Sequence, residues 1–404
     1  MVMKVLQINT VYGRGSTGKI AKDIHDTSNG KGITCITAYR YHEKCALFLE
    51  DSIAVSSWLD CHVHNRLVKY TLLQGYYSYI KTKKFLRSIE HDTPDIIHLH
   101  NLHGNYINLK LLFGFIRKKN IPVVWTLHDC WAFTGYCPHY TLSGCEKWKT
   151  GCIACTEYKP AIPVMRDVTG WMWKNKKKWI TGVNELILIT PSQWLNTQVQ
   201  SSFLSGCKTK VIYHGIDLDL FKPTDSDIKE RYGISASKFV VLGVAFDWNY
   251  RKGLDVFIEL ATRLDSKIYQ IVLVGTNAEV DKTLPPNIIS IHKTNDQSEL
   301  AAIYSAADLF VNPTREEMFG LVNVEANACG TPVVTFRTGG CPECIDSTSG
   351  IVVEFGDIDA MERAIHHVCE KKPFSQEACV ERARCFNKQD KFQEYIDLYK
   401  SITK

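Results

Sequence analysis

Long apolar runs are missing from this sequence of 404 residues, and none approaches the roughly 18–20 residues that a membrane-spanning helix needs. The first residues, MVMKVLQINTVYGRG, lack the apolar core and the cleavage site of a signal peptide and predict a buried first strand instead. The sequence also contains no internal repeat and no low-complexity segment. These absences argue against membrane-spanning helices and a repeat array, and we expect a cytoplasmic protein.

Cysteine, by contrast, is not scarce, because the chain has 15 of them. Without an export signal, so many cysteines indicate the reducing cytosol and argue against a disulfide framework. The length is sufficient for two or three domains, each with a hydrophobic core of its own.

Positive and negative charges are distributed unevenly along the chain. Residues 1–200 carry 25 Lys and Arg against 14 Asp and Glu, whereas residues 201–404 carry 23 against 29. A basic first half is typical of a domain that faces anionic lipid or a phosphorylated acceptor. Nucleic acid would also attract positive charge, but no nucleic-acid-binding motif accompanies it, and we expect no nucleic-acid partner.

Strand-like runs alternate with helical patterns along the whole chain, which predicts parallel α/β sheets. The predicted strands of the first half are Val5–Asn9, Thr34–Tyr39, Ile96–His100, Val123–Leu127 and Leu186–Thr190. Those of the second half are Thr209–Ile212, Val240–Val244, Ile271–Val274, Ile288–His292, Leu309–Asn312 and Val333–Phe336. Two such sets predict two domains.

We place the first domain at residues 1–205, with a cysteine-rich insertion at about 130–160, and the second at 206–387. The remaining residues, 388–404, contain a predicted last helix. Its apolar residues recur at helical spacing. They are Phe392, Tyr395, Ile396 and Tyr399.

The stretch NPTREEMFGLVNVEANACGTPVVTFRTGGCPECID, residues 312–346, organises the second half. Glu317 would lie on a loop after a predicted strand, at the edge where open α/β sheets bind ligands. Glu325 follows on a predicted helix and would reach a different part of the same ligand.

The predicted helix begins near Phe319, Gly320 and Leu321, where free backbone N–H groups form a site for an anion. Carboxylates accept hydrogen bonds from hydroxyls, and amides at a helix N-terminus face phosphate. Together these groups predict a pocket for a nucleotide sugar.

The stretch resembles the E-x7-E signature of the retaining glycosyltransferases of family 4. The downstream segments Gly330–Val334 and Gly339–Glu343 match the G-T-P-V-V and G-G-x-P-E segments of that family. The resemblance implies the GT-B fold, an α/β architecture of two Rossmann-like domains whose parallel sheets face each other across a cleft. It also implies that the last helix packs back on the N-terminal domain.

The resemblance further implies an NDP-sugar donor and no requirement for a divalent metal. By this resemblance Glu317 holds hydroxyls of the transferred sugar, and Glu325 holds the ribose hydroxyls. The amides of Phe319, Gly320 and Leu321 stabilise the departing diphosphate.

The segment VVLGVAFDWNYRKGLDVFIEL, residues 240–260, resembles the phosphate-binding loop of the family. Lys252 matches the family lysine, which stabilises the diphosphate as its negative charge grows. The family arginine is missing, because Phe246 stands at its position, and neighbouring Arg251 is our candidate for the second positive charge. Nearby, His214 stands where the family usually has Asn.

The glycine-rich loop from Gly13 to Ile20 matches the P-loop motif of nucleoside triphosphatases, G-x-x-x-x-G-K-[ST], at every position but the last. Ile20 replaces the hydroxyl residue that would hold Mg²⁺, which argues against that chemistry. The loop resembles the first loop of family 4, and the resemblance places Gly15 near the donor phosphates. Lys19 is either a contact to the ligand or a solvated helix residue.

In VVWTLHDCWAFTG, residues 123–135, His128 and Asp129 follow a buried strand. The pattern resembles the family motif T-x-H-D, whose histidine faces the transferred sugar, and we expect a catalytic role for His128. The segment PDIIHLHNLHGNYIN resembles the family stretch that lines the acceptor side, with His100 and Asn101 as candidates.

Cys137, Cys145, Cys152 and Cys155 could close a structural zinc site, although only the last pair has the spacing of a zinc knuckle. The alternative is four reduced thiols in a loop insertion. We expect no catalytic metal.

The segment WMWKNKKKWI, residues 171–180, places Trp171, Trp173 and Trp179 among lysines. This pattern is typical of a helix on an anionic membrane surface. An ordinary amphipathic helix with tryptophans in the core fits it equally well. The segment KTKKFLR, residues 81–87, adds positive charge.

These features predict a retaining glycosyltransferase of the hexosyltransferase type, peripheral at the cytoplasmic face of the membrane. It would move a sugar from an NDP-sugar to a lipid-linked saccharide in bacterial O-antigen (lipopolysaccharide), capsule or exopolysaccharide biosynthesis. An NDP-sugar epimerase of GT-B fold would use the same donor pocket without an acceptor. A non-catalytic partner protein would be expected to lose Glu317 or Lys252, and both are present.

Overall fold

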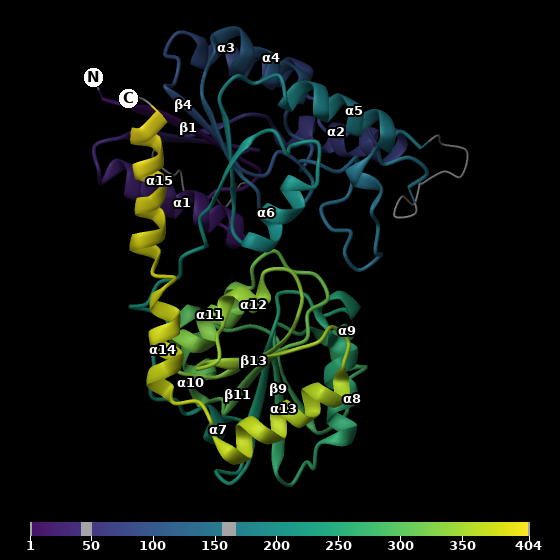
Figure 1. Cartoon of the computed structure of the whole chain (residues 1–404), viewed down its shortest axis with the longest axis vertical. Coiled ribbons are helices and arrows are strands. Elements are labelled where there is room, and N and C mark those ends of the chain that lie inside the picture. Colours follow the sequence, from purple (N-terminus) through teal and green to yellow (C-terminus); the bar gives the residue numbers. More distant parts are fainter. Residues whose placement is uncertain (1, 42–50, 156–166, 403–404) are drawn as a thin grey trace. The chain divides into compact units, whose positions relative to one another are not determined.

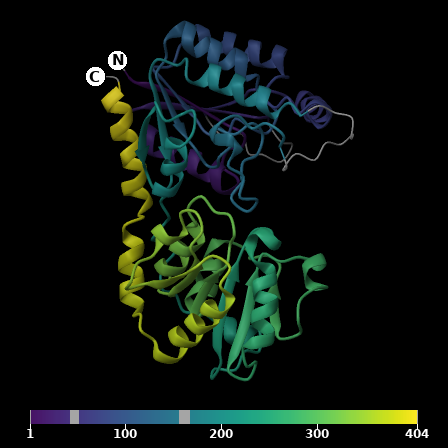
Figure 2. The same ribbon diagram turned by 45° about the vertical axis from the view of Figure 1, so that its right-hand side comes forward.

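The computed structural model describes residues 2–41, 51–155 and 167–402, and it divides the chain into two compact units (Figures 1 and 2). The first unit consists of Met1–Ile212 together with Phe392–Lys404, and the second of Tyr213–Lys391. Each unit is an α/β body built on its own parallel sheet, which confirms the predicted fold class.

Within the described residues, the first unit contains a sheet of seven parallel strands in the order β3-β2-β1-β4-β5-β6-β7. The strands are β1 (Lys4–Asn9), β2 (Thr34–Tyr39), β3 (Ser52–Ala54), β4 (Ile96–Leu99), β5 (Val123–Thr126), β6 (Leu186–Thr190) and β7 (Lys208–Val211). The helices are α1 (Gly15–Asn29), α2 (Trp58–Thr71), α3 (Tyr79–Glu90), α4 (Leu109–Lys119), α5 (Thr169–Ile180), α6 (Gln193–Gln200), the 3-10 turn η1 (Lys147–Lys149) and most of α15 (Lys388–Ile402).

The second unit, all of which the structure describes, contains a sheet of six parallel strands in the order β10-β9-β8-β11-β12-β13. The strands are β8 (Phe239–Val244), β9 (Tyr269–Val274), β10 (Ile288–Ile291), β11 (Leu309–Asn312), β12 (Val333–Phe336) and β13 (Gly350–Val353). The helices are α7 (Ile228–Arg231), η2 (Tyr250–Lys252), α8 (Leu254–Arg263), α9 (Ala278–Asp281), α10 (Gln297–Ala306), α11 (Leu321–Ala328), α12 (Cys341–Cys344), α13 (Ile358–Lys371) and α14 (Gln376–Arg384).

The inner strands are almost wholly buried, since helices cover both faces of each sheet, as parallel sheets require. On one face of the first sheet, apolar side chains of α1 and α15 share a core with strand residues. The α15 residues in it include Phe392, Tyr395, Ile396 and Tyr399. On another part of the unit α4 lies between α3 and α5, in contact with both (Figures 1 and 2).

The strand order reverses once in each sheet, between β1 and β4 in the first and between β8 and β11 in the second. In open α/β sheets the carboxyl ends of the two strands at such a switch point border the ligand crevice. The loops that follow these four strands are therefore where each unit presents its functional side chains.

The boundary between the units lies after Ile212, later than the predicted 205. The reason is β7, which we assigned to the second half and which instead pairs in parallel with β6 at the edge of the first sheet. The sequence also gave no signal for β3 and β13, which are short edge strands. Among the described residues no helix is both long and apolar enough to cross a membrane.

Candidate functional site

Two loops of the second unit meet at its switch point and bring a cation and a carboxylate together. Lys252 ends η2, which follows β8, and Glu317 lies on the loop that follows β11. Lys252 Nζ donates to Glu317 Oε2 at 2.7 Å, and both side chains remain partly exposed, at 22% and 24%. Two residues that the sequence identified separately are thus in contact at the edge of the sheet where ligands bind.

Arg315 connects these two loops by hydrogen bonds. The sequence did not predict this role. Its guanidinium makes two hydrogen bonds of 2.7 Å with the carboxylate of Asp255 in the first turn of α8. It also donates to the carbonyl of Tyr250 at 2.6 Å and lies over the Tyr250 ring. The backbone N–H of Arg315 donates to the carbonyl of Arg251 at 2.8 Å. The loop that carries Lys252 is therefore held by several bonds to one buried arginine.

Two glycines allow the close approach of backbone around this pair. At Gly253, where φ is 77°, a Cβ atom would lie 2.4 Å from the carbonyl oxygen of Pro313. At Gly339, where φ is 52°, a Cβ atom would lie 1.6 Å from the carbonyl oxygen of Glu317. The glycines of R-K-G and G-G-x-P-E are thus required by the fold of the site, since any other side chain would collide with backbone.

Glu325 lies on α11, partly exposed, and the hydroxyl of Tyr304 donates to its Oε2 at 3.1 Å. Tyr304 is wholly buried on α10, so the carboxylate of Glu325 is held from the inside of the unit. Gly320 precedes α11 with φ of 100° and caps it without a side-chain hydrogen bond. Phe319, Gly320 and Leu321 are therefore at the beginning of the helix, as predicted.

His214 is buried beside Glu317 and against the ring of Phe319, with ring centroids 6.0 Å apart. Burial lowers the pKa of His214 to about 4, although the charge of Glu317 acts in the opposite direction. At neutral pH the imidazole is uncharged, so it can accept and donate one hydrogen bond each, as the amide of the family's Asn would.

The position of the missing family arginine is open to solvent. The side chain of Phe246 is fully exposed on the loop after β8. The side chain of Arg251 is partly exposed and forms no salt bridge with another described residue. Arg251 is thus next to Lys252 with its guanidinium available.

In the first unit, a chain of hydrogen bonds runs across the carboxyl ends of β1, β4 and β5. His100 Nδ1 and His128 Nε2 lie 3.0 Å apart, and His100 Nε2 lies 2.9 Å from Gln7 Oε1. His98, two residues earlier, forms hydrogen bonds with the hydroxyls of Tyr399 at 2.5 Å and Thr126 at 2.8 Å. His98 in β4 and His100 directly after it therefore support the fold around His128, which is itself partly exposed.

Asp129 is paired with His103 at 2.7 Å rather than with His128. Burial alone would raise the pKa of Asp129, but the hydrogen bond and charge of His103, together with the N–H of Trp131, hold it below its ordinary value. Asp129 is therefore an anion that fixes the loop after β5. The residue that contacts the ring of His128 is His100, through the 3.0 Å approach of His100 Nδ1 to His128 Nε2.

The first loop follows β1 at the same switch point. Gly15 begins α1 with φ of 61°, and a Cβ atom there would meet nothing within 4 Å. Gly13 N–H donates to the carbonyl of Gly18 at 2.9 Å and closes the turn. Lys19 is exposed on α1. The open space at Gly15 is compatible with a ligand close to the backbone.

The four cysteines of the insertion lie in the described residues, Cys152 buried and the other three partly exposed. Burial raises the pKa of Cys137 to about 12, and the charges of Cys152 and Cys155 act in the same direction. No group of three or more His, Cys, Asp or Glu side chains is placed to hold a metal ion in the part of the chain that the structure describes. Metal analysis of the purified protein tests the zinc expectation.

The tryptophan-rich helix α5 turns most of its aromatic side chains inward. Trp173 and Trp179 are buried, and only Trp171 is exposed among the three. Lys176 is fully buried, donates to the carbonyls of Trp131 and Thr134 at 2.7 and 3.1 Å, and lies over the Trp131 ring. The alternative that the tryptophans of this helix lie in the core is thus correct for two of the three.

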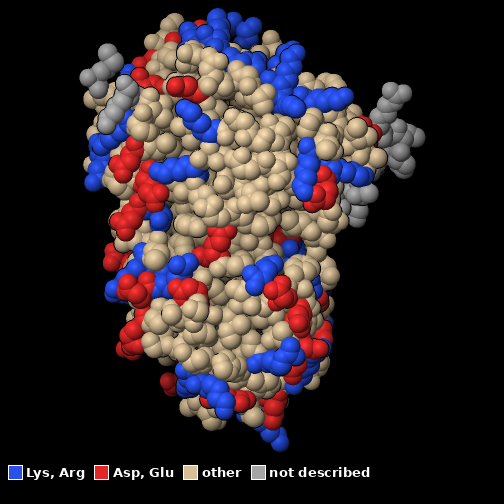
Figure 3. Space-filling view, in the orientation of Figure 1, with Lys and Arg blue, Asp and Glu red and all other residues tan. Residues whose placement is uncertain are grey.

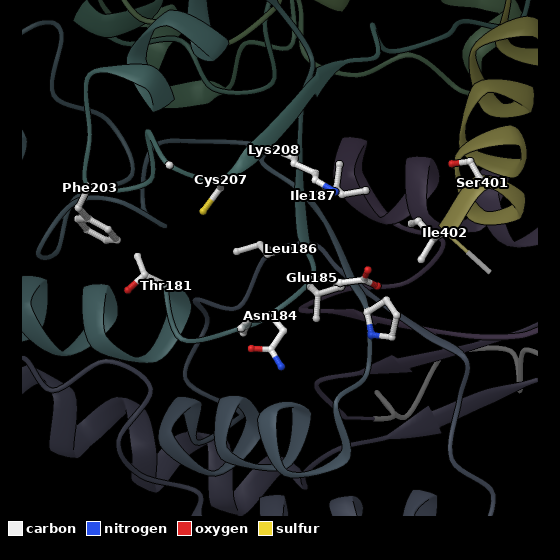
Figure 4. A pocket seen from close by; sticks show the side chains of 14 residues that line it. Thr181, Asn184, Glu185, Leu186, Ile187, Phe203, Cys207, Lys208, Ser401 and Ile402 are labelled. Carbon is white, nitrogen blue, oxygen red and sulfur yellow. The ribbon is translucent and has the colours of Figure 1, made fainter. Parts of the chain in front are cut away.

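A cavity of about 530 Å³ lies at the opposite edge of the first sheet (Figure 4). It is lined by residues at the amino ends of β5, β6 and β7, among them Glu185, Leu186 and Lys208, and by Ser401 and Ile402 of α15. Because ligands of open α/β sheets bind at carboxyl ends, this cavity is separate from the candidate site.

Comparison with known proteins relates both units to one class of enzymes. Residues 51–220 match the family described as Glycosyltransferase Family 4, and residues 237–371 match the family described as Glycosyl transferases group 1. WcaC of Escherichia coli K12, named as a colanic acid biosynthesis glycosyl transferase, is 23% identical and aligns with 99% of this chain and 100% of its own.

Solved structures agree on the fold over almost the whole chain. Sucrose-phosphate synthase from Thermosynechococcus elongatus superposes with a TM-score of 0.71 at 18% identity, covering 99% of both chains. Alr3699/HepE of Anabaena, solved in complex with UDP-glucose, has a TM-score of 0.67 at 16% identity and covers 99% of this chain and 100% of its own. These neighbours confirm the GT-B fold.

Proposed function

The chain belongs to the glycosyltransferases of family 4, and from this premise we propose that it is a retaining hexosyltransferase that uses an NDP-sugar donor. The observation that carries the proposal is the contact of Lys252 with Glu317 at the switch point of the second unit. At this place the cation of Lys252 would bind the diphosphate of such a donor, and the carboxylate of Glu317 would bind its sugar hydroxyls.

In this proposal Glu317 accepts hydrogen bonds from the sugar, and Glu325 accepts them from the ribose. When the donor is bound, Lys252 turns from Glu317 toward the diphosphate and donates hydrogen bonds to it. Negative charge grows there as the glycosidic bond breaks. The amides of Phe319, Gly320 and Leu321 face the same phosphates at the beginning of α11. The complex of HepE with UDP-glucose supports a nucleotide sugar as the ligand of this fold.

Arg251 supplies the second positive charge in place of the family arginine. Its guanidinium is next to Lys252 in the chain and forms no salt bridge with another described residue. Arg251→Ala is expected to weaken diphosphate binding, and Phe246→Arg in the same variant is expected to restore it. Binding that is unchanged in Arg251→Ala would assign the charge to Lys252 alone.

The acceptor in this proposal is a lipid-linked saccharide of a bacterial surface polysaccharide, such as O-antigen, capsule or exopolysaccharide. WcaC, which aligns over its full length, is named for colanic acid biosynthesis and supports this class of pathway. The second support is a basic surface on the first unit, suited to an anionic membrane at its cytoplasmic face.

This basic surface is formed by α3, α4 and α5. The exposed cations are Lys83, Lys84, Arg87, Lys110, Arg117, Lys118, Lys174, Lys177 and Lys178. The three helices contain a single carboxylate, Glu90, which pairs with Lys119 at 3.0 Å. Figure 3 shows blue side chains gathered where Figure 1 places α3 and α4. Anionic lipid headgroups attract such a surface with about 1 kcal/mol per Lys or Arg.

Apolar side chains accompany the basic surface on α2 and at the beginning of α3. Leu59 and Val63 are 65% and 50% exposed, and Ile80 is 79% exposed. Exposed aliphatic residues beside cations suit an interfacial contact, in which apolar groups enter the headgroup region. We expect the apolar part of the contact with the bilayer to come from α2 and α3 rather than from α5.

Vesicle flotation tests the membrane contact with phosphatidylcholine vesicles, with and without phosphatidylglycerol. We expect binding only with phosphatidylglycerol, and a loss of at least about thirtyfold for Lys83→Glu with Lys84→Glu. Leu59→Ser with Val63→Ser is expected to weaken binding, whereas Ile268→Ser, an exposed residue of the second unit, is the matched control. Equal binding of wild type and both double variants would contradict the contact.

Thermal shift with UDP, GDP and ADP tests the donor site. We expect one nucleotide to stabilise the protein selectively and Lys252→Ala and Glu325→Ala to weaken that effect. Lys282→Ala, an exposed lysine of the same unit, is the control. No stabilisation by any nucleotide in a folded protein would count against the transferase and favour a non-catalytic partner protein.

A further inference from the structure

The hydrogen bonds that link Ala21, Gln7, His100 and His128 permit one arrangement of protons. The side-chain nitrogen of Gln7 lies 2.9 Å from the carbonyl oxygen of Ala21. A carbonyl oxygen only accepts hydrogen bonds, so the amide group of Gln7 must be oriented with its N–H toward Ala21. Its oxygen, Oε1, is then the atom that faces His100.

Gln7 Oε1 is an acceptor, and His100 Nε2 lies 2.9 Å from it. His100 must therefore carry its proton on Nε2 and donate it to Gln7. His100 is 1% exposed and stacks on the buried ring of His98, with centroids 4.1 Å apart. A charge in this place is costly, because burial disfavours the imidazolium and lowers the pKa of the neighbouring His98 to about 3.

His100 is thus neutral, with its lone pair on Nδ1. His128 Nε2 lies 3.0 Å from that atom, so His128 must donate a proton from Nε2. The proton positions in this series of hydrogen bonds all follow from one acceptor, the backbone carbonyl of Ala21 on α1. The contact of β1, β4 and β5 side chains in parallel register makes this possible, because the three strands are adjacent in the sheet.

We propose that Gln7 and His100 are positioning residues that hold neutral His128 as the Nε2–H tautomer, which leaves Nδ1 as the only nitrogen of that ring able to accept a proton. The inference rests on the proposed function for the role of His128, but the tautomer itself does not. Because the Nε2 proton is committed to His100, a hydrogen bond between the neutral ring and a sugar hydroxyl has the hydroxyl as donor and Nδ1, an atom buried in this structure, as acceptor. This relay (Ala21, Gln7, His100 and His128) therefore selects the kind of contact that His128 makes.

Long-range ¹H–¹⁵N spectra of the full-length protein with ¹⁵N-labelled histidine test the tautomer directly. We expect neutral His128 and His100 to show the nitrogen shift pattern of the Nε2–H form at pH 7.5. The variants His100→Gln and His128→Gln assign the two rings among the 14 histidines of the chain. A Gln at position 100 still offers an acceptor, so His128 is expected to keep its pattern in that variant.

Gln7→Met removes the acceptor that fixes His100, and we expect the shifts of both rings to move toward an average of the two tautomers. Gln270→Met is the matched control, since Gln270 is also buried but belongs to the second unit. An Nδ1–H pattern for His128 in the wild type, or an unchanged pattern in Gln7→Met, would overturn the relay.

The positioning role is tested separately by the release of nucleoside diphosphate from an NDP-sugar. Gln7→Met is expected to lower turnover about tenfold, with nucleotide affinity unchanged, because the proposed nucleotide site lies in the other unit. Full turnover in Gln7→Met despite a lost tautomer would overturn the positioning role, whereas full turnover in His128→Ala would overturn the proposed role of His128 itself.

Discussion

Arg315 is the residue on which the geometry of the donor loops depends most. It joins the loop after β11 to Asp255 and Tyr250, on either side of Lys252, with its side chain 8% exposed. A lysine keeps the charge but cannot make the paired hydrogen bonds of a guanidinium.

We therefore expect Arg315→Lys to lower the free energy of unfolding of the second unit by about 1–3 kcal/mol. Nucleotide affinity should fall about tenfold, because the loop that carries Lys252 loses its support. Chemical denaturation and calorimetric titration measure the two effects. Arg337→Lys is the control, since Arg337 pairs with Glu354 in solvent, where such a pair contributes little. Equal losses in both variants would contradict the role of Arg315.

His214 gives the second unit a dependence on acid. Its pKa is lowered by burial to about 4 in the folded chain, against 6.5 for an ordinary histidine. Between these values the unfolded chain binds a proton that the folded chain does not, so stability falls as the pH decreases through this window. The loss amounts to at most about 3 kcal/mol.

The variant His214→Asn has no group that titrates in this window. Its unfolding transition should consequently shift less between pH 7 and pH 4.5 than that of the wild type. His98 and His64, whose pKa values burial lowers to about 3 and 4, keep part of the dependence in both proteins. An identical pH dependence in both proteins would show that folding does not lower the pKa of His214.

At the residue scale, the site residues that belong to a sequence motif were predicted. The residues that act only through contacts with distant parts of the chain were missed. Glu317, Lys252 and Glu325 were found because their spacing and neighbours resemble a family signature. Arg315 and Tyr304 gave no signal, because their partners Asp255 and Glu325 lie 60 and 21 residues away and meet them only in the folded sheet. Gln7 likewise reaches His100 across 93 residues.

At the scale of elements, α15 is fixed to the first sheet by polar contacts as well as by its apolar face. Tyr399 and His98 form a hydrogen bond of 2.5 Å, and the hydroxyls of Thr126 and Tyr395 lie 3.2 Å apart, all of them buried. The sequence predicted the apolar spacing of this helix but not its hydroxyl contacts.

Tyr399→Phe keeps the buried ring and leaves His98 Nδ1 without its hydroxyl. We expect the free energy of unfolding of the first unit to fall by about 1–3 kcal/mol. Tyr77→Phe removes a hydrogen bond of 2.8 Å to Thr71 that is only partly buried, and it should cost less. Urea denaturation followed by circular dichroism compares the two. A smaller loss in Tyr399→Phe than in Tyr77→Phe would contradict the anchoring role.

The elements that the sequence left open or assigned to the wrong unit share one physical cause, which is that burial depends on the neighbours of a segment. The lysines of α5 suggested an interfacial helix, yet the structure buries Lys176 against Trp131 and exposes apolar side chains on α2 instead. Similarly, β7 is a short strand whose membership in the first sheet is decided by pairing with β6.

At the scale of the whole molecule, alternating strands and helices sufficed to predict two parallel α/β units. Strand order was not predictable from the sequence, and strand order is what places the loops after β8 and β11 at one switch point. The motif around Glu317 forms a site only because this strand order places the loop with Lys252 beside it.

The central claim is that the site around Lys252 and Glu317 breaks the glycosidic bond of an NDP-sugar and retains its anomeric configuration. Proton NMR of the protein with a panel of NDP-sugars and no acceptor follows the slow hydrolysis expected of such a site. We predict nucleoside diphosphate and a free sugar whose first-formed anomer matches the donor, with neither product in Glu317→Gln or Lys252→Ala. A sugar altered at a ring carbon would indicate an epimerase, and donors that all remain intact would contradict the claim.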